Sequence, residues 1–192
     1  MAVPPLCAIV AVCKASKGIG NKGSLPWGRS LPNEMKHFAR VTTNTTDPDK
    51  CNAVVMGRRT WESIPENRRP LPRRINIVIS SGLCQESVPE GVKVAKSFDE
   101  ALEIAGTGCC KGQSRVERIF VIGGTQVYVD AMRHPAMDTV YLTEVLGQFE
   151  CDTFLNIDTR KFTDIEDPAV TNEEQEENGI RYKYRVLKKI PQ

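Results

Sequence analysis

The feature that most constrains this chain is the alternation of short apolar, β-branched segments with helical patterns. The first segment, Leu6–Val12, is apolar on both faces, which predicts a central strand buried on both sides. Further strand-like segments follow at Ala53–Met56, Ile75–Ile79, Val92–Ala95 and Arg118–Ile122. Strands that alternate with helices predict an α/β fold with a largely parallel sheet.

The last third of the chain has a different pattern. Thr139–Val145 alternates polar and apolar residues as an antiparallel strand does, and Ile180–Leu187 reads as a half-exposed strand near an edge. The acidic run Asn172–Asn178 is interpreted as a solvated hairpin connection. We therefore expect antiparallel additions at one edge of the sheet.

Helical spacing predicts four helices, and Ser97 with Glu100 three residues later forms a capping-box pattern before one of them. The expected helices are Asn33–Thr42, Arg58–Ile64, Asp99–Ala105 and Thr125–Met132. The expected loops are Ala15–Ser30, Thr42–Lys50 and Gly106–Ser114. No internal repeat or linker interrupts the 192 residues, which predicts a single domain over 1–192.

Composition excludes several classes of protein. A net charge of +2, from 26 basic and 24 acidic residues, argues against nucleic-acid binding through bulk charge. No run approaches the roughly 18 apolar residues of a membrane span, and the N-terminus lacks the basic start of a signal peptide. We expect a cytoplasmic protein that binds neither nucleic acid nor membrane. No spare apolar face is evident, so a monomer is expected.

Seven cysteines without a Cys-x-x-Cys pair, and two histidines, argue against a metal site. Cys7, Cys13 and Cys51 lie in or beside apolar runs and are predicted to be small core residues. A reducing compartment is the simplest inference.

Two strand-to-helix junctions could bind anions. At Gly123-Gly124 a buried strand ends and a helix begins, and the free N–H groups of a helix start attract negative charge. A plain tight turn explains the same glycines, and the Gly-x-Gly-x-x-Gly fingerprint is absent.

At the other junction, Gly57 precedes Arg58, Arg59 and Thr60. Positive charges oppose the helix dipole unless an anion sits there, although two solvated arginines remain an alternative. Together the junctions indicate a ligand with separated phosphates across the carboxyl ends of the strands.

A glycine-rich segment, Ile19–Trp27, leads into a helix whose first turn carries Glu34. Glu34, Phe38 and Val41 are three or four residues apart, so they share a helix face. Glu34 is therefore either a functional acid on an apolar face or a surface residue that stabilises the helix through its dipole.

Six collinear motifs together resemble dihydrofolate reductase, over nearly the whole chain from about Leu6. Each is weak alone, but their order is specific. They are Ile19-Gly20 with Leu25-Pro26-Trp27, Asn33-Glu34 with Phe38, Met56–Pro65, Arg69-Pro70-Leu71, Arg74–Ser80 and Ile122-Gly123-Gly124 with Val127-Tyr128. Glutamate in place of aspartate, and long loops, are similar to eukaryotic members.

The resemblance implies a central, mostly parallel eight-stranded sheet with flanking helices and an antiparallel C-terminal edge hairpin. It implies reduction of 7,8-dihydrofolate to 5,6,7,8-tetrahydrofolate by hydride transfer to C6 and protonation at N5, with NADPH as cofactor. Such an enzyme supplies one-carbon metabolism and thymidylate synthesis and is a target of antifolate inhibitors.

The resemblance also implies site residues. The catalytic residues would be Glu34, Trp27, which would hold a water, and Thr143, which would support the carboxylate. Burial should raise the pKa of Glu34 more than the helix start lowers it. The substrate would contact Ile9, Glu34, Met35, Phe38, Ser63, Ile64, Arg68, Leu71, Arg74, Ile122 and Thr143, with Arg74 on its α-carboxylate. NADPH would be held by Ala11, Ile19, Gly20, Gly23, Ser24, Gly57, Arg58, Arg59, Thr60, Ser80, Ser81, Gly82, Lys96, Gly123, Gly124, Thr125, Gln126, Val127 and Tyr128.

Three positions depart from the family pattern. Met35 replaces an aromatic ring and should pack less rigidly on the substrate. Ser81 replaces an arginine, which leaves the cofactor's 2′-phosphate to Arg58, Ser80 and Lys96. Arg68 adds positive charge near the substrate's tail, either for polyglutamylated folates or as part of solvated basic turns.

Two alternatives are a pyrimidine reductase of the riboflavin pathway and a non-catalytic folate- or nucleotide-binding protein. Glu34 after Leu-Pro-Trp argues against the first. The combination of Glu34, Trp27 and Thr143 counts against the second.

Overall fold

The computed structural model describes residues 3–108 and 115–191, and the chain divides into two compact units. The first unit contains Met1–Cys7 and Ala39–Met137, and the second contains Ala8–Phe38 and Asp138–Gln192. Strand β1 (Leu6–Cys13) and helix α1 (Pro32–Thr43) therefore each begin in one unit and end in the other.

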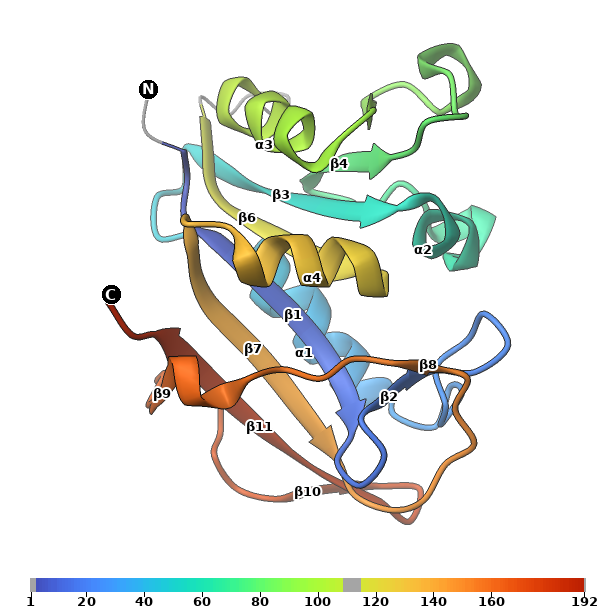
Figure 1. The fold of residues 1–192 in the computed structure, drawn as a ribbon, viewed down its shortest axis with the longest axis vertical. Coiled ribbons are helices and arrows are strands. Elements are labelled where there is room, and N and C mark those ends of the chain that lie inside the picture. The colour runs from blue at the N-terminus through green and yellow to red at the C-terminus, as the bar shows by residue number, and fades with distance from the viewer. Residues whose placement is uncertain (1–2, 109–114, 192) are drawn as a thin grey trace. The chain divides into compact units, whose positions relative to one another are not determined.

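The first unit is built on parallel strands in the order β6 (Arg115–Gly123), β3 (Lys50–Gly57), β4 (Arg74–Ile79) and β5 (Val92–Ala95) (Figure 1). Consecutive residues of β3 and β4 are buried, as expected of parallel strands that are covered on both faces. Helix α2 (Arg58–Ser63) packs on β3 and β4, α3 (Phe98–Thr107) on β4, β5 and β6, and α4 (Thr125–Arg133) on β6. Short 3₁₀ turns lie at Glu66–Arg68 and Gln85–Ser87.

The capping box before α3 forms with one difference. The Ser97 hydroxyl accepts a hydrogen bond from the Glu100 N–H, as expected, but the Glu100 carboxylate accepts from the N–H of Lys96. The loop predicted over Gly106–Ser114 begins two residues later than expected, because Gly106 and Thr107 belong to α3. The rest of this loop, with Cys109 and Cys110, lies largely outside the described residues.

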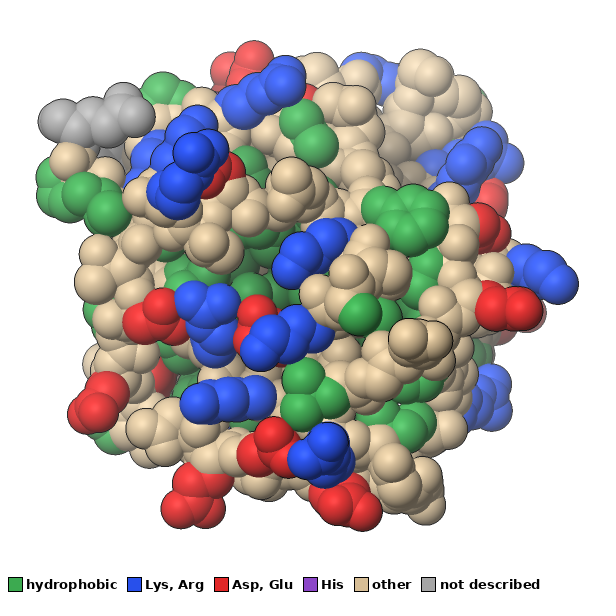
Figure 2. Space-filling model, turned by 60° about the horizontal axis from the view of Figure 1, so that its bottom comes forward, with side chains coloured by type: hydrophobic (Ala, Val, Ile, Leu, Met, Phe, Trp, Pro, Cys, Tyr) green, Lys and Arg blue, Asp and Glu red, His purple; other side chains and the backbone are tan. Residues whose placement is uncertain are grey.

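The second unit is built on antiparallel strands. Strand β11 (Ile180–Lys189) pairs with β7 (Met137–Val145), β10 (Gln175–Glu177) and β9 (Phe162–Ile165). Basic and acidic side chains intermingle on the face shown in Figure 2. On these strands Arg185 pairs with Asp164 and Glu144, and Lys188 pairs with Asp138.

Four short strands were not predicted. Strand β2 (Gly18–Gly20), within the expected loop Ala15–Ser30, pairs with β8 (Thr153–Phe154), and β9 follows a 3₁₀ turn at Thr159–Lys161. Such strands depend on distant partners, so local propensity does not reveal them. The acidic run Asn172–Asn178 is likewise more than a solvated connection, because Gln175–Glu177 forms β10 and only Asn178 and Gly179 make the turn.

The expected fold class is confirmed. In the described residues, the first unit carries the parallel strands of a mixed sheet, the second carries the antiparallel strands near the C-terminus, and four α-helices accompany them. Cys7, Cys13 and Cys51 are buried, as predicted. Within residues 3–108 and 115–191, no helix combines the length and apolar character needed to cross a membrane.

Candidate active site

The second unit buries a single acid in the first turn of α1. Pro32 is the first residue of this helix, where the missing N–H of proline costs nothing. Glu34 follows on the buried face and is only 5% exposed. The Thr143 hydroxyl, from β7, donates a hydrogen bond to Oε1 of Glu34 at 3.1 Å.

Burial raises the pKa of Glu34 from 4.5 to about 7. Desolvation is the largest cause, the hydrogen bond from Thr143 opposes it, and the charge of Glu177 raises the pKa further. The expectation that desolvation prevails is confirmed. Glu34 can therefore hold or release a proton near neutral pH, as a general acid requires.

An aromatic cluster lies beside α1 in this unit. Trp27 and Leu31 pack with Val145, Tyr182 and Tyr184. The Trp27 ring meets Phe149 edge to face, with ring centroids 5.7 Å apart. Its indole Nε1 is buried and has no hydrogen-bond partner among residues 3–108 and 115–191. A buried indole N–H normally donates a hydrogen bond, so the site is chemically suited to an acceptor such as a water or a ligand oxygen.

The other expected residues of the second unit differ in exposure. On β1, Ile9 is buried and Ala11 is half-buried. On α1, Phe38 is half-buried, whereas Met35 is 46% exposed and does not belong to the core. Of the loop residues predicted to hold cofactor, Ile19 and Gly20 lie in β2, and Gly23 and Ser24 in a tight turn where Asn21 and Ser24 exchange backbone hydrogen bonds.

In the first unit, the carboxyl ends of the parallel strands bring the two glycine junctions together. Met56 of β3 is level with Gly123 of β6, and Gly57 is level with Ile79 of β4. A Cβ atom built on Gly57 would lie 3.7 Å from the backbone nitrogen of Gly124. The N-terminal ends of α2 and α4 thus emerge at one edge of the sheet.

Both helix starts offer free donors. Gly57 and Gly124 are the N-cap residues of α2 and α4, and neither start has a side-chain capping bond in the described part of the chain. Gly123 has φ +128, and a Cβ there would approach Thr60 Oγ1 to 3.0 Å, so a side chain is excluded on two grounds. Thr125, Gln126, Val127 and Tyr128 form the first turn of α4.

Polar and basic groups gather next to this edge. A Cβ on Gly82 would lie 3.8 Å from Arg58 Nη1, and Arg58 Nε donates to Glu62 at 2.6 Å. Lys96 Nζ donates to the carbonyl of Leu83 at 2.7 Å, and the Ser80 hydroxyl accepts from the Leu83 N–H. Arg59 and Ser81 are exposed. These cations, hydroxyls and free amides suit a phosphorylated ligand.

Arg74 is a buried guanidinium without an acidic partner. It is 8% exposed, and it donates to the carbonyl of Pro72 at 2.9 Å and to Thr42 Oγ1 at 2.8 Å. Desolvation, followed by the charge of Arg73, lowers its pKa to about 10. No carboxylate in the described ranges forms an ion pair with Arg74, so the position is suited to an external anion.

The other predicted substrate residues of this unit surround α2 and the segment before β4. Ile64, Leu71 and Ile122 are half-buried, whereas Ser63 and Arg68 are exposed. Asn76 fixes Leu71 through two hydrogen bonds of 2.8 Å: its Oδ1 accepts from the Leu71 N–H, and its Nδ2 donates to the Leu71 carbonyl.

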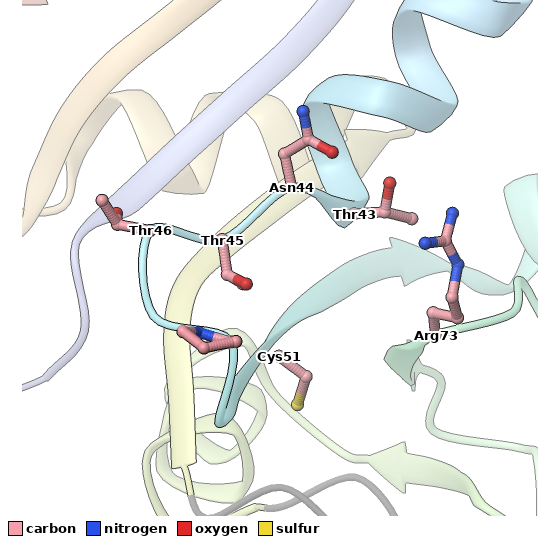
Figure 3. A pocket seen from close by; sticks show the side chains of 7 residues that line it. Thr43, Asn44, Thr45, Thr46, Cys51 and Arg73 are labelled. Carbon is pink, nitrogen blue, oxygen red and sulfur yellow. The ribbon is translucent and has the colours of Figure 1, made fainter.

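A cavity of about 320 Å³ lies at the opposite ends of the parallel strands (Figure 3). It is lined by Thr43, Asn44, Thr45, Thr46, Pro48, Cys51 and Arg73. None of these residues is a predicted site residue; the lining comes from the end of α1 and the loop after it, from Cys51 of β3, and from Arg73 just before β4. We assign no role to it.

Sequence reasoning missed Thr42, Asn76 and Glu177. Asn76 had a usable signal, since it is a polar residue inside the apolar run Ile75–Ile79. Thr42 and Glu177 had none, because their partners are distant in sequence.

A buried acid with a raised pKa in one unit, and two helix N-termini beside cationic side chains at a sheet edge in the other, suit an α/β enzyme that acts on anionic ligands. The family model for dihydrofolate reductase matches residues 6–189. The dihydrofolate reductase of Drosophila melanogaster is 41% identical to this chain, over 94% of this chain and 96% of its own length. That of Rattus norvegicus is 44% identical, over 97% of this chain and 98% of its own length. The solved structure of Schistosoma mansoni dihydrofolate reductase has a TM-score of 0.83 at 36% identity, covering 98% of this chain and 100% of that one.

This chain belongs to the dihydrofolate reductase family. The family and the enzyme class expected from the sequence, an oxidoreductase, are thereby confirmed.

Proposed function

We propose that this chain reduces 7,8-dihydrofolate to 5,6,7,8-tetrahydrofolate with NADPH, by hydride transfer to C6 and protonation at N5. The observation that carries the proposal is Glu34, a buried acid whose pKa lies near 7 in a chain of this family. The same pterin pocket would bind antifolate inhibitors.

The first unit supplies groups that fit NADPH. The N-termini of α2 and α4 at Gly57 and Gly124 would hold the diphosphate, because the backbone N–H groups of a helix start attract negative charge. Arg58, Ser80 and Lys96 would hold the 2′-phosphate in place of the arginine that Ser81 replaces. NADPH, when bound, supplies the hydride.

The second unit supplies the acid. Glu34 would hold the 2-amino group and N3 of the pterin, and Thr143 keeps its carboxyl oriented. The Trp27 Nε1–H would hold a water beside Glu34, through which the proton reaches N5. Burial keeps a large fraction of Glu34 protonated at neutral pH, so the proton is available when it is needed.

Arg74 would bind the α-carboxylate of the substrate's glutamate. Its buried charge is already fixed by Thr42 and Pro72, so little side-chain entropy is lost on binding. We further propose that both units act as one domain, as a cytoplasmic monomer without nucleic-acid or membrane partners.

Loss of NADPH absorbance on addition of dihydrofolate tests the proposal, with NADH as the comparison cofactor. Glu34→Gln should keep the fold and NADPH binding but lose about two to four decades of turnover, as expected when a proton-transfer group is removed. Full activity of this variant at neutral pH would exclude Glu34 from the mechanism.

The same assay separates the alternatives. Turnover of the aminopyrimidine substrate without turnover of dihydrofolate would indicate a riboflavin-pathway reductase. Stoichiometric methotrexate binding without NADPH oxidation would indicate a folate-binding protein that has no catalytic role.

A further inference from the structure

Glu177, the last residue of β10, reaches the first turn of α1. The Asn33 N–H donates to its Oε1 at 2.7 Å, and the Glu34 N–H donates to its Oε2 at 3.3 Å. The first N–H groups of a helix lack partners within the helix, and a carboxylate stabilises them through hydrogen bonds and the helix dipole. Glu177 therefore acts as a cap on α1 that comes from a distant part of the chain.

The carboxylate of Glu177 is itself held in place. The hydroxyl of Tyr182, a buried residue of β11, donates to Oε2 of Glu177 at 2.7 Å. In the adjoining hairpin turn, Asn178 Nδ2 donates to the carbonyl of Ser30 at 2.8 Å. The hairpin thus fixes the chain immediately before α1 as well as its first turn.

Glu177 also lies near enough to Glu34 for its charge to act on the buried acid. From β7, Glu34 meets the neutral Thr143. Two titratable side chains of the neighbouring elements contact the same ring: His37 of α1 stacks on Tyr184 with ring centroids 3.9 Å apart, and Tyr182 of β11 meets Tyr184 edge to face at 5.5 Å. Glu177 is the group whose charge acts directly on Glu34 and raises its pKa.

We propose that Glu177 is a positioning residue for the reaction: it fixes the turn that carries Glu34 and places a second negative charge beside that acid. The inference rests on the proposed function, in which Glu34 supplies the proton. Its two contributions, hydrogen bonding and charge, can be separated by substitution.

The experiment measures the pH dependence of the hydride-transfer step in the wild type, Glu177→Gln and Glu177→Asp. Gln keeps an acceptor oxygen but removes the charge, so the midpoint should fall by about 0.5 to 1 pH unit. The rate at neutral pH should then fall about two- to fivefold, because less Glu34 is protonated, while the rate at low pH is kept. Asp keeps the charge at a shorter reach and should shift the midpoint less.

Glu176→Gln is the matched control. It removes the same charge from an exposed neighbour on β10 and should leave the midpoint unchanged. If Glu177→Gln does not fold, the midpoint in Glu177→Asp decides. A fall of this midpoint supports the proposal, and a midpoint that stays or rises overturns it. A lower melting temperature with an unchanged midpoint would overturn the proposal and leave Glu177 as a structural cap only.

A second readout does not depend on turnover. The carboxyl carbon of Glu34, followed by NMR during a pH titration of the ligand-free protein, should titrate at lower pH in Glu177→Gln. An unchanged titration would overturn the inference even in an active enzyme. If the wild type fails to oxidise NADPH with dihydrofolate, the proposed function fails, while the titration still decides whether Glu177 acts on Glu34.

Discussion

Replacement of Glu34 by glutamine should make the protein more stable at alkaline pH while it abolishes most of the activity. The pKa of Glu34 is about 7 in the folded protein and 4.5 in its ordinary state, so the unfolded chain ionises first. The neutral carboxyl therefore contributes stability that is fully present below pH 4.5 and is lost as the pH rises through 7. The difference between the two pKa values corresponds to about 3 kcal/mol.

Glutamine has nearly the same shape, still accepts the hydrogen bond from Thr143, and does not ionise. The free energy of unfolding of Glu34→Gln, relative to the wild type, should thus rise by about 2 to 3 kcal/mol between about pH 5 and pH 8. Urea unfolding at a series of pH values measures this difference. Glu176→Gln controls for general charge effects, since this carboxylate is exposed.

The result that refutes this reasoning is a difference between Glu34→Gln and the wild type that stays constant over that pH range. It would mean that Glu34 ionises at the same pH in the folded and unfolded chain, so that burial does not hold it protonated. The proton-donor role would then lose its physical basis.

Two further substitutions test the neighbouring groups. Arg74→Leu should raise the Michaelis constant for dihydrofolate about 10- to 100-fold with little change in kcat, as expected for a lost charge-assisted pair. Arg73→Leu, at an exposed position, should leave the Michaelis constant unchanged. Equal Michaelis constants in the wild type and Arg74→Leu would exclude Arg74 from binding the substrate's α-carboxylate. Thr143→Val removes the hydrogen bond that lowers the pKa of Glu34, so the midpoint of the pH–rate profile should move to higher pH. This shift is opposite to the one expected for Glu177→Gln. A midpoint that moves to lower pH would contradict the role of Thr143 as a hydrogen-bond donor to Glu34.

Local sequence pattern predicted the parallel strands, the four helices and the two glycine junctions. Leu6–Val12 is apolar on both faces, and the glycines at 57 and at 123 and 124 lie where strands give way to helices, so the local pattern was sufficient. Glu34 could be recognised as a candidate because its helix face is otherwise apolar. Its functional assignment, however, came from the family resemblance, since dipole stabilisation explains a first-turn glutamate equally well.

Which polar groups contact one another could be seen only in the folded chain. Glu177 lies in an acidic run that local composition assigns to solvent, yet more than 140 residues of chain separate it from the amides that it caps. Strands β2 and β8 pair across a similar distance, and Thr42 meets Arg74 from another element. The physical reason is that hydrophobic periodicity is a local property, whereas hydrogen bonds and the field acting on a buried acid depend on groups that folding alone brings together.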